Sequence, residues 1–133
     1  MLQFTEYIHY DEKQILQLYA SVGWYNYTDR RDMLRAAYSN SLYVLAAYDG
    51  DNLVGIIRAV GDGASIIFIQ DLLVLPAYQR QGVGTKLVKR VMDKYKDAYQ
   101  LVLLTEAIEK NIAFYQSLGL KRVDEYGCCA FIR

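Results

Sequence analysis

The sequence predicts an α+β fold in which a mixed, mostly antiparallel sheet has helices on both faces. Turn sequences at residues 49–52 and 61–64 separate apolar segments, which indicates an antiparallel meander of strands. Residues 66–75 and 100–105 are buried-strand segments, joined by a basic amphipathic helix over residues 83–96. A strand, helix and strand of this length form a right-handed crossover, so these two strands are expected to run parallel.

Length and composition limit the classes of protein that fit. The 133 residues, 53% of them hydrophobic, suffice for one core, so a single domain is expected over residues 1–133. A net charge of zero argues against general nucleic-acid binding. No apolar run predicts a transmembrane helix, and the N-terminus does not resemble a signal peptide. The adjacent Cys128 and Cys129 are poorly placed to bridge one another and suit a reducing cytoplasm.

Before the meander, the sequence predicts one strand and two helices. Asp11 is the expected N-cap of a helix over residues 12–22, which ends at Gly23. Thr28 or Asp29 is expected to cap the second helix. The strands on either side are expected at residues 2–10, 42–48 and 53–60.

The end of the chain is predicted to contain one more helix and a hairpin. The helix covers residues 109–118 and ends at Gly119. A closing β-hairpin is expected from residues 121–123 and 127–133, with residues 124–126 as its turn.

The junction between the long apolar strand and the basic helix has the chemistry of an anion site. Pro76 ends the strand, so the backbone groups of Val74 and Leu75 are expected to be free for a ligand. The first turn of the next helix has unpaired N–H groups and the positive end of the helix dipole. Gly82 and Gly84 lack a Cβ, so a phosphate can approach their backbone closely.

Charge supports the same interpretation. Six basic residues and one acidic residue lie between Arg80 and Lys96, an excess that favours a multiply charged ligand such as a nucleotide pyrophosphate. The alternative is a solvated helix face, formed by Lys86, Lys89, Arg90 and Lys94. The glycine spacing fits neither a P-loop nor a dinucleotide-binding fingerprint, which needs a small residue at Leu87.

Gln79, Gly82 and Gly84 match the acyl-CoA-binding signature Gln/Arg-x-x-Gly-x-Gly/Ala of the GNAT family of N-acetyltransferases, which the chain resembles. The predicted element order is similar over nearly the whole chain. The resemblance implies the acetyltransferase fold, with a V-shaped opening between two parallel central strands beyond Val74 and Leu103. It also implies acetyl-CoA as co-substrate and no metal. The implied CoA-binding residues are Leu73, Val74, Leu75, Arg80, Gln81, Gly82, Val83, Gly84, Thr85 and Asn111.

Residues 111–120 resemble the last signature of the same family. The family's tyrosine, which commonly lies near the CoA sulfur and can protonate it, corresponds to Tyr115. Many members have an asparagine seven residues before this tyrosine, where this chain has Ile108. Asn111, one helical turn before Tyr115, is the candidate for the missing contact. The alternative for Tyr115 is a core aromatic beside Phe114.

The aromatic break between the first two helices is the candidate acceptor side. Tyr25, Asn26 and Tyr27 lie there, and loops that expose aromatics often contact ligands. In the family, the corresponding segment commonly lines the acceptor side of the cleft. Packing between the helices is the alternative, and it is favoured for Trp24.

The resemblance implies direct attack of a primary amine on the acetyl thioester. A backbone N–H near Val74 is the expected oxyanion donor and Tyr115 the expected acid. For the base, Asp71, Glu106 and a water chain are all candidates, and Asp71 could equally be a hydrogen-bonded strand carboxylate or bind the acceptor amine. His9, the one histidine, is interpreted as structural.

Other functions are left open. A non-catalytic acyl-CoA-binding regulatory module would have the same cleft, and a protein-interaction unit would use the C-terminal hairpin. For the enzyme, the expected partner is a small-molecule or peptide amine, with no nucleic acid and no membrane. The identity of the amine, and whether the chain forms a homodimer, are left open.

Overall fold

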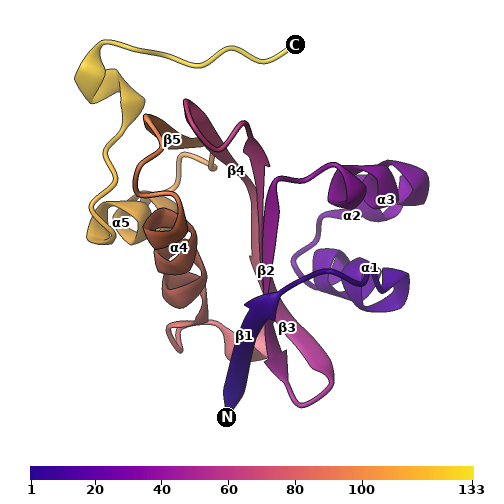
Figure 1. The fold of residues 1–133 in the computed structure, drawn as a ribbon. Helices are drawn as coiled ribbons and strands as arrows, with labels where there is room; N and C mark the ends of the chain where they lie inside the picture. Colours follow the sequence, from indigo (N-terminus) through magenta and orange to yellow (C-terminus); the bar gives the residue numbers. More distant parts are fainter. The chain divides into compact units, whose positions relative to one another are not determined.

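The centre of the fold is a five-stranded sheet with the strand order β1-β2-β3-β4-β5 (Figure 1). β4 and β5 are parallel, and all other neighbours are antiparallel, as the sequence predicted. The strands are β1 Leu2–Glu6, β2 Tyr43–Asp49, β3 Asn52–Gly61, β4 Ile66–Val74 and β5 Gln100–Leu103. The computed structural model describes all residues from 1 to 133, which form two compact units, residues 1–103 and 104–133, each described by itself below.

Helices cover both faces of the sheet in the first unit (Figure 1). They are α1 Glu12–Ser21, α2 Tyr25–Thr28, α3 Arg31–Ser39 and α4 Val83–Lys94. α4 packs against β3 at Gly55, where an added Cβ would lie 3.1 Å from Val83 Cγ1. The short α2 lies where the sequence predicted only a break between helices. No helix of the chain is both long and apolar enough to cross a membrane.

The opposite face of the sheet forms the main apolar core with α1 and α3. Its members are mostly aliphatic, and burial of such side chains contributes about 1.5–3 kcal/mol each. They are Ile15, Leu18, Tyr19, Leu34, Tyr38, Val44, Ala46, Leu53, Ile56 and Leu73. This core joins α1 and α3 to the sheet, and Trp24 and Tyr27, next to and within α2, pack against it.

The pairing of β4 with β5 stops before β4 ends. Their pairing runs from Ile66 opposite Gln100 to Ile69 opposite Leu103. β4 then continues through residues 70–74 with no β5 partner, so the opening that the resemblance implied begins at Ile69. The pairing of β3 with β4 shifts register at the same level, which leaves Gln70 without an opposite residue. Such bulges re-aim the side chains that follow them.

The second unit contains α5 Glu109–Ser117 and the 3₁₀ helix η2 Val123–Tyr126, and no strand. The predicted closing hairpin is therefore wrong. Arg122 N–H donates to Glu125 Oε2, and the Arg122 guanidinium pairs with Asp124, so local contacts favour a helical turn. Gly127 ends this turn at φ 72°, and residues 128–133 are exposed and make no strand pairing.

Candidate functional site

The loop before α4 adopts a left-handed conformation at two positions. The 3₁₀ helix η1, Pro76–Tyr78, leads into Arg80 at φ 63° and Gly82 at φ 82°. A left-handed non-glycine residue costs roughly 1–2 kcal/mol, so the backbone is strained at Arg80. α4 then begins with the hydrogen bond from Lys86 N–H to the Gly82 carbonyl, at 3.0 Å. The two left-handed residues thus lie in the turn immediately before the first hydrogen bond of α4.

The start of α4 presents unpaired donors. No side chain caps the helix, and the N–H groups of Val83, Gly84 and Thr85 have no protein acceptor. An added Cβ at Gly82 would meet nothing within 4 Å, so the space beside this backbone is open. Unpaired N–H groups, a helix dipole and an open glycine together fit a phosphate or diphosphate group.

Two side chains anchor this loop. Tyr78 donates to Asp49 at the end of β2, and Gln79 Nε2 donates to the Val74 carbonyl at 3.0 Å. Leu75 N–H donates to the Val54 carbonyl at 2.8 Å, and the Leu75 carbonyl accepts from Tyr78 N–H. The prediction that the backbone groups of Val74 and Leu75 are all free is therefore wrong.

One backbone donor remains at the end of β4. In an antiparallel pair, successive amides point alternately to the two sides of a strand. Since Leu75 N–H points to β3, the Val74 N–H points to the other side, where β5 has already ended. The Leu73 side chain is buried in the core, at 1% exposed. Val74 N–H is thus the candidate donor for a developing oxyanion.

The basic side chains of α4, Lys86, Lys89, Arg90 and Lys94, are exposed, as a solvated helix face requires, and three of them lie over aromatic rings of β1 and β2. Lys86 Nζ lies 4.5 Å from the centre of the Phe4 ring, and the Arg90 guanidinium covers the same ring at 5.7 Å. Lys94 Nζ lies 4.8 Å from the centre of the Tyr43 ring. Arg80 lies closest in sequence to Gly82 among these basic residues. It is exposed and forms no ion pair, so its guanidinium is free to bind an anion.

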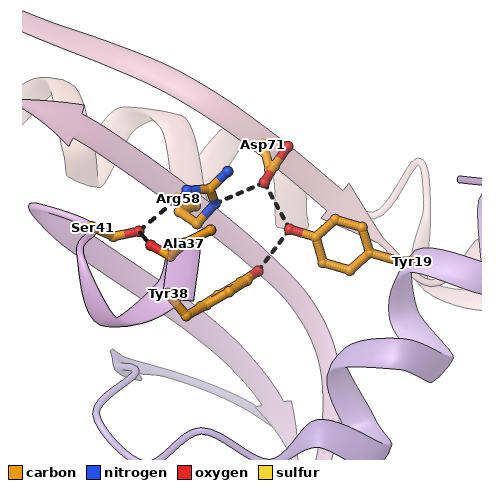
Figure 2. Close-up of polar contacts among 6 residues, drawn as sticks. All are labelled: Tyr19, Ala37, Tyr38, Ser41, Arg58 and Asp71. Atoms are coloured by element: carbon orange, nitrogen blue, oxygen red, sulfur yellow. Dashed lines mark hydrogen bonds and ion pairs between the residues drawn. The ribbon is translucent and has the colours of Figure 1, made fainter. Parts of the chain in front are cut away.

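Asp71 on β4 lies in a buried polar cluster (Figure 2). Its Oδ2 accepts from Arg58 Nε at 2.8 Å and from the Tyr19 hydroxyl at 2.7 Å, while Oδ1 has no donor. The Tyr19 hydroxyl lies 2.9 Å from that of Tyr38. Arg58 also reaches Ser41 Oγ at 3.4 Å. Asp71 and Arg58 are only 1% and 6% exposed.

The charges in this cluster follow from burial and pairing. Burial, the largest single effect, lowers the pKa of Arg58, but Asp71 together with Tyr19 and Tyr38 raises the net pKa above the ordinary value. Burial raises the pKa of Tyr19 and of Tyr38 well above that of a free tyrosine. At neutral pH, Arg58 is a cation and both tyrosines are neutral. Asp71 is thus a paired strand carboxylate whose second oxygen is buried without a partner, and its role as base remains a prediction.

The candidate acceptor residues lie on α2. Tyr25 is 61% exposed and Asn26 is exposed, whereas Tyr27 is partly buried. The Tyr27 ring centre lies 5.3 Å from that of Tyr19 and 5.8 Å from that of Trp24. Trp24 packs on the core, as expected. An open depression lined by residues 28–33 follows α2. Tyr25 and Asn26 are therefore available to a ligand, while Tyr27 supports the segment.

The second unit holds Tyr115 and Asn111 on α5. Asn111 Nδ2 donates to Thr105 Oγ1 at 3.1 Å, and the Tyr115 ring packs on Phe114 with centres 4.9 Å apart. Burial raises the pKa of Tyr115, so its hydroxyl is neutral at pH 7 and can donate a proton. Glu106, the alternative base, is exposed in the segment before α5, and Ile108 is the N-cap residue of that helix.

The partners of Asp71 were not predicted as site residues. Arg58 is the one charged residue of the apolar segment 53–60, and Asp71 is the one charged residue of segment 66–75. Buried charges are paired as a rule, so these two isolated charges on consecutive strands could have indicated the ion pair. Nothing in the sequence marked Tyr19 as their neighbour.

Comparisons with known proteins bear on the family and the fold. The family model described as the acetyltransferase (GNAT) family matches residues 8–120. A GNAT-family acetyltransferase from Streptococcus pneumoniae TIGR4 is 44% identical, with a TM-score of 0.90 over 100% of this chain and 97% of that chain. An uncharacterized N-acetyltransferase, ycf52-like, from Prochlorococcus marinus is 31% identical over 96% of this chain and 72% of the relative. A probable acetyltransferase from Staphylococcus aureus, 23% identical, has a TM-score of 0.83 over 100% of this chain and 99% of that one, and shares the fold.

Proposed function

Because the chain belongs to the acetyltransferase (GNAT) family, we propose that it transfers an acetyl group from acetyl-CoA to a primary amine. The observation that carries the proposal is the start of α4. There, three unpaired N–H groups and the open side of Gly82 offer donors and space that suit a diphosphate, after the part of β4 that has no β5 partner.

The proposed contacts of acetyl-CoA follow from this site. The diphosphate would be held by the loop and first turn of α4, and the acyl end would lie along the end of β4. The Asn111 amide is a further candidate contact. The full set of proposed CoA-binding residues is Leu73, Val74, Leu75, Arg80, Gln81, Gly82, Val83, Gly84, Thr85 and Asn111.

In the proposed reaction, the amine nitrogen attacks the thioester carbonyl directly. A C–N bond forms, the C–S bond breaks, the nitrogen loses a proton and the departing thiolate gains one. Val74 N–H is the proposed oxyanion donor, and Tyr115 is the proposed acid. Asp71 Oδ1, the carboxylate oxygen without a donor, is the proposed proton acceptor, directly or through one water. Glu106 and a water chain remain the alternatives.

The amine is proposed to bind beside α2, at Tyr25, Asn26 and Tyr27. One solved structure with the same fold, at 20% identity, is an aminoglycoside acetyltransferase in complex with sisomicin, so sisomicin belongs among the amines to test. A net charge of zero gives no strong attraction to a polycation, so amino acids and peptides belong there too. Two exposed free cysteines suit a reducing compartment, and a cytoplasmic location is part of the proposal.

A non-catalytic acyl-CoA-binding module is the second candidate. The pairing of Asp71 with Arg58 favours it, because Asp71 Oδ2 is already occupied by Arg58 and Tyr19, as in a carboxylate with a structural role. Such a module would bind acetyl-CoA through the same α4 site and would acetylate no amine.

The test is a panel of amines with acetyl-CoA. Spermidine, sisomicin, single amino acids and a short peptide would be incubated with the protein, and release of the CoA thiol would be followed. Amine-dependent thiol release supports the enzyme. Tight binding of acetyl-CoA by calorimetry, without release for any amine, supports the module. Failure to bind acetyl-CoA contradicts both.

A further inference from the structure

Tyr19 lies between the candidate base, Asp71, and the candidate acceptor segment, residues 25–27 on α2. Its hydroxyl contacts Asp71 on β4, and its ring contacts Tyr27 on α2. We propose that Tyr19 is a positioning residue that couples the two, so that the place of the acceptor segment depends on the Tyr19–Asp71 hydrogen bond. Its consequence for catalysis rests on the proposed function, in which Asp71 and α2 act on the amine.

The hydroxyl sets the direction of the carboxylate. Tyr19 and Arg58 donate to the same oxygen, Oδ2, from α1 and from β3 (Figure 2). Asp71 is 1% exposed and Oδ1 has no donor, so no other protein contact orients this side chain through its second oxygen. With Oδ2 held at two points, the position of Oδ1 is fixed. Loss of either donor would let the carboxylate turn.

The ring of the same residue supports α2. This helix has four residues, no side-chain N-cap and no buried residue, so it has little stability of its own. Tyr27 and Trp24 connect it to the core, and their ring centres lie 5.3 Å and 6.0 Å from that of Tyr19. Tyr19 is itself fully buried. One side chain therefore contacts both β4 and the acceptor segment.

Tyr19 is suited to this role because it is a permanent donor. Burial, and then the neighbouring Tyr38 and Asp71, raise its pKa far above the ordinary value. Its proton therefore stays in place at neutral pH. The Tyr38 hydroxyl, 2.9 Å away, holds the Tyr19 hydroxyl from the other side.

The decisive variant is Tyr19→Phe, which removes the hydroxyl and keeps the ring. Tyr10→Phe is the matched control, because Tyr10 also has a buried hydroxyl and packs 5.4 Å from the Tyr38 ring, yet its hydroxyl has no partner. With an amine from the panel that the wild type acetylates, Tyr19→Phe should lower the kcat/KM for the amine about tenfold. Its KM for acetyl-CoA should stay within about twofold, and Tyr10→Phe should change neither by more than about twofold.

A double-mutant cycle tests whether Tyr19 acts through Asp71. If it does, adding Tyr19→Phe to Asp71→Asn should change the kcat/KM for the amine by less than about twofold. Independent effects that multiply would overturn the coupling. So would a Tyr19→Phe protein that melts at a lower temperature but has wild-type kinetics, because that is the result of a purely structural role.

Hydrogen exchange gives a readout that needs no turnover. The amides of Tyr27 and Asp29 donate to the carbonyls of Trp24 and Tyr25 in α2. Both should exchange faster in Tyr19→Phe and at the wild-type rate in Tyr10→Phe. If the wild type binds acetyl-CoA and acetylates no amine, the proposed function fails, while this exchange difference still supports the coupling. Equal exchange in the two variants overturns the coupling whatever the wild type catalyses.

Discussion

Arg58 and Asp71 form an ion pair across β3 and β4, with Arg58 Nε 2.8 Å from Asp71 Oδ2. They are opposite one another immediately before the register of these strands shifts at Gln70. The bulge thus coincides with the one buried charge pair of the sheet and with the level at which β5 separates from β4. The bulge at Gln70 and the candidate base Asp71 are therefore adjacent on β4.

Breaking this pair should destabilise the protein strongly. Arg58→Met leaves the Asp71 carboxylate buried without its cation, and removal of one partner of a buried pair typically costs about 3–5 kcal/mol. Arg122→Met is the comparison, since Arg122 pairs with Asp124 at an exposed site and should cost less than about 1 kcal/mol. Urea unfolding measures both. Equal losses for the two variants would contradict the energetic account of the cluster.

Glycine at position 82 should matter for CoA and not only for the turn. Gly82→Ala strains a left-handed position and places a methyl group in the proposed diphosphate space. Gly119→Ala is a matched control, because Gly119 has φ 87° and likewise no atom within 4 Å of an added Cβ. Both should lose about 1 kcal/mol of stability. By calorimetry, only Gly82→Ala should bind CoA more weakly, and similar CoA affinities in the two would place the diphosphate elsewhere.

Tyr115→Phe tests the proposed acid. It removes the phenolic proton and almost no volume, so stability and CoA affinity should stay within about 1 kcal/mol of wild type. Positioned proton transfer is typically worth about 10²–10⁴-fold, and turnover should fall at least about tenfold because water can partly replace the hydroxyl. Tyr99→Phe, at an 85% exposed position, is the control. Unchanged turnover in Tyr115→Phe would remove it from the mechanism if chemistry limits the rate.

The turn between β3 and β4 should make stability depend on pH. Hydrogen bonds from the Ser65 hydroxyl and then from the backbone of Ala64, Ile66 and Ser65 hold the pKa of Asp62 below its ordinary value near 3.8. A lowered folded-state pKa means that the carboxylate stabilises the fold above its ordinary pKa and that this contribution is lost as the pH falls further.

The comparison of Asp62→Ala with wild type measures this contribution. The variant should melt at a lower temperature at pH 7, and the difference should shrink as the pH falls below about 4. Asp51→Ala is the control for removing a carboxylate from a turn, because the Asp51 side chain, between β2 and β3, makes no hydrogen bond. A constant difference for Asp62→Ala across this range would show that the carboxylate charge is not responsible.

The central part of the fold could be predicted because its local chemistry is strong. Pro76 and Gly82 mark the end of β4 and the start of α4, and two turn sequences mark the meander. The closing hairpin was wrong for an equally local reason. Arg122 contacts both Asp124 and Glu125, which favours a helical turn at the residues predicted as the turn of a hairpin.

Other features of the site depend on three-dimensional packing. No residue pattern indicates that β3 and β4 shift register at Gln70, or that Tyr19, far away in the sequence, reaches Asp71. The bond from Leu75 N–H to the Val54 carbonyl depends on the pairing of Leu75 with the start of β3, which no residue pattern indicates either. The anion site could be predicted because it consists of consecutive residues, whereas the polar cluster joins residues from α1, α3, β3 and β4.

The central claim, acetyl transfer to an amine at the α4 site, is tested most directly by measuring both products of one reaction. Wild type and Gly84→Val would be incubated with acetyl-CoA and the amine panel, with the CoA thiol and the acetylated amine quantified by mass spectrometry. The account predicts that wild type forms the two products in equal amounts with at least one amine, and that Gly84→Val, weakened in CoA binding by about 2 kcal/mol or more, forms far less of both at low acetyl-CoA. Thiol release without acetylated amine, or undiminished products from Gly84→Val, would contradict it.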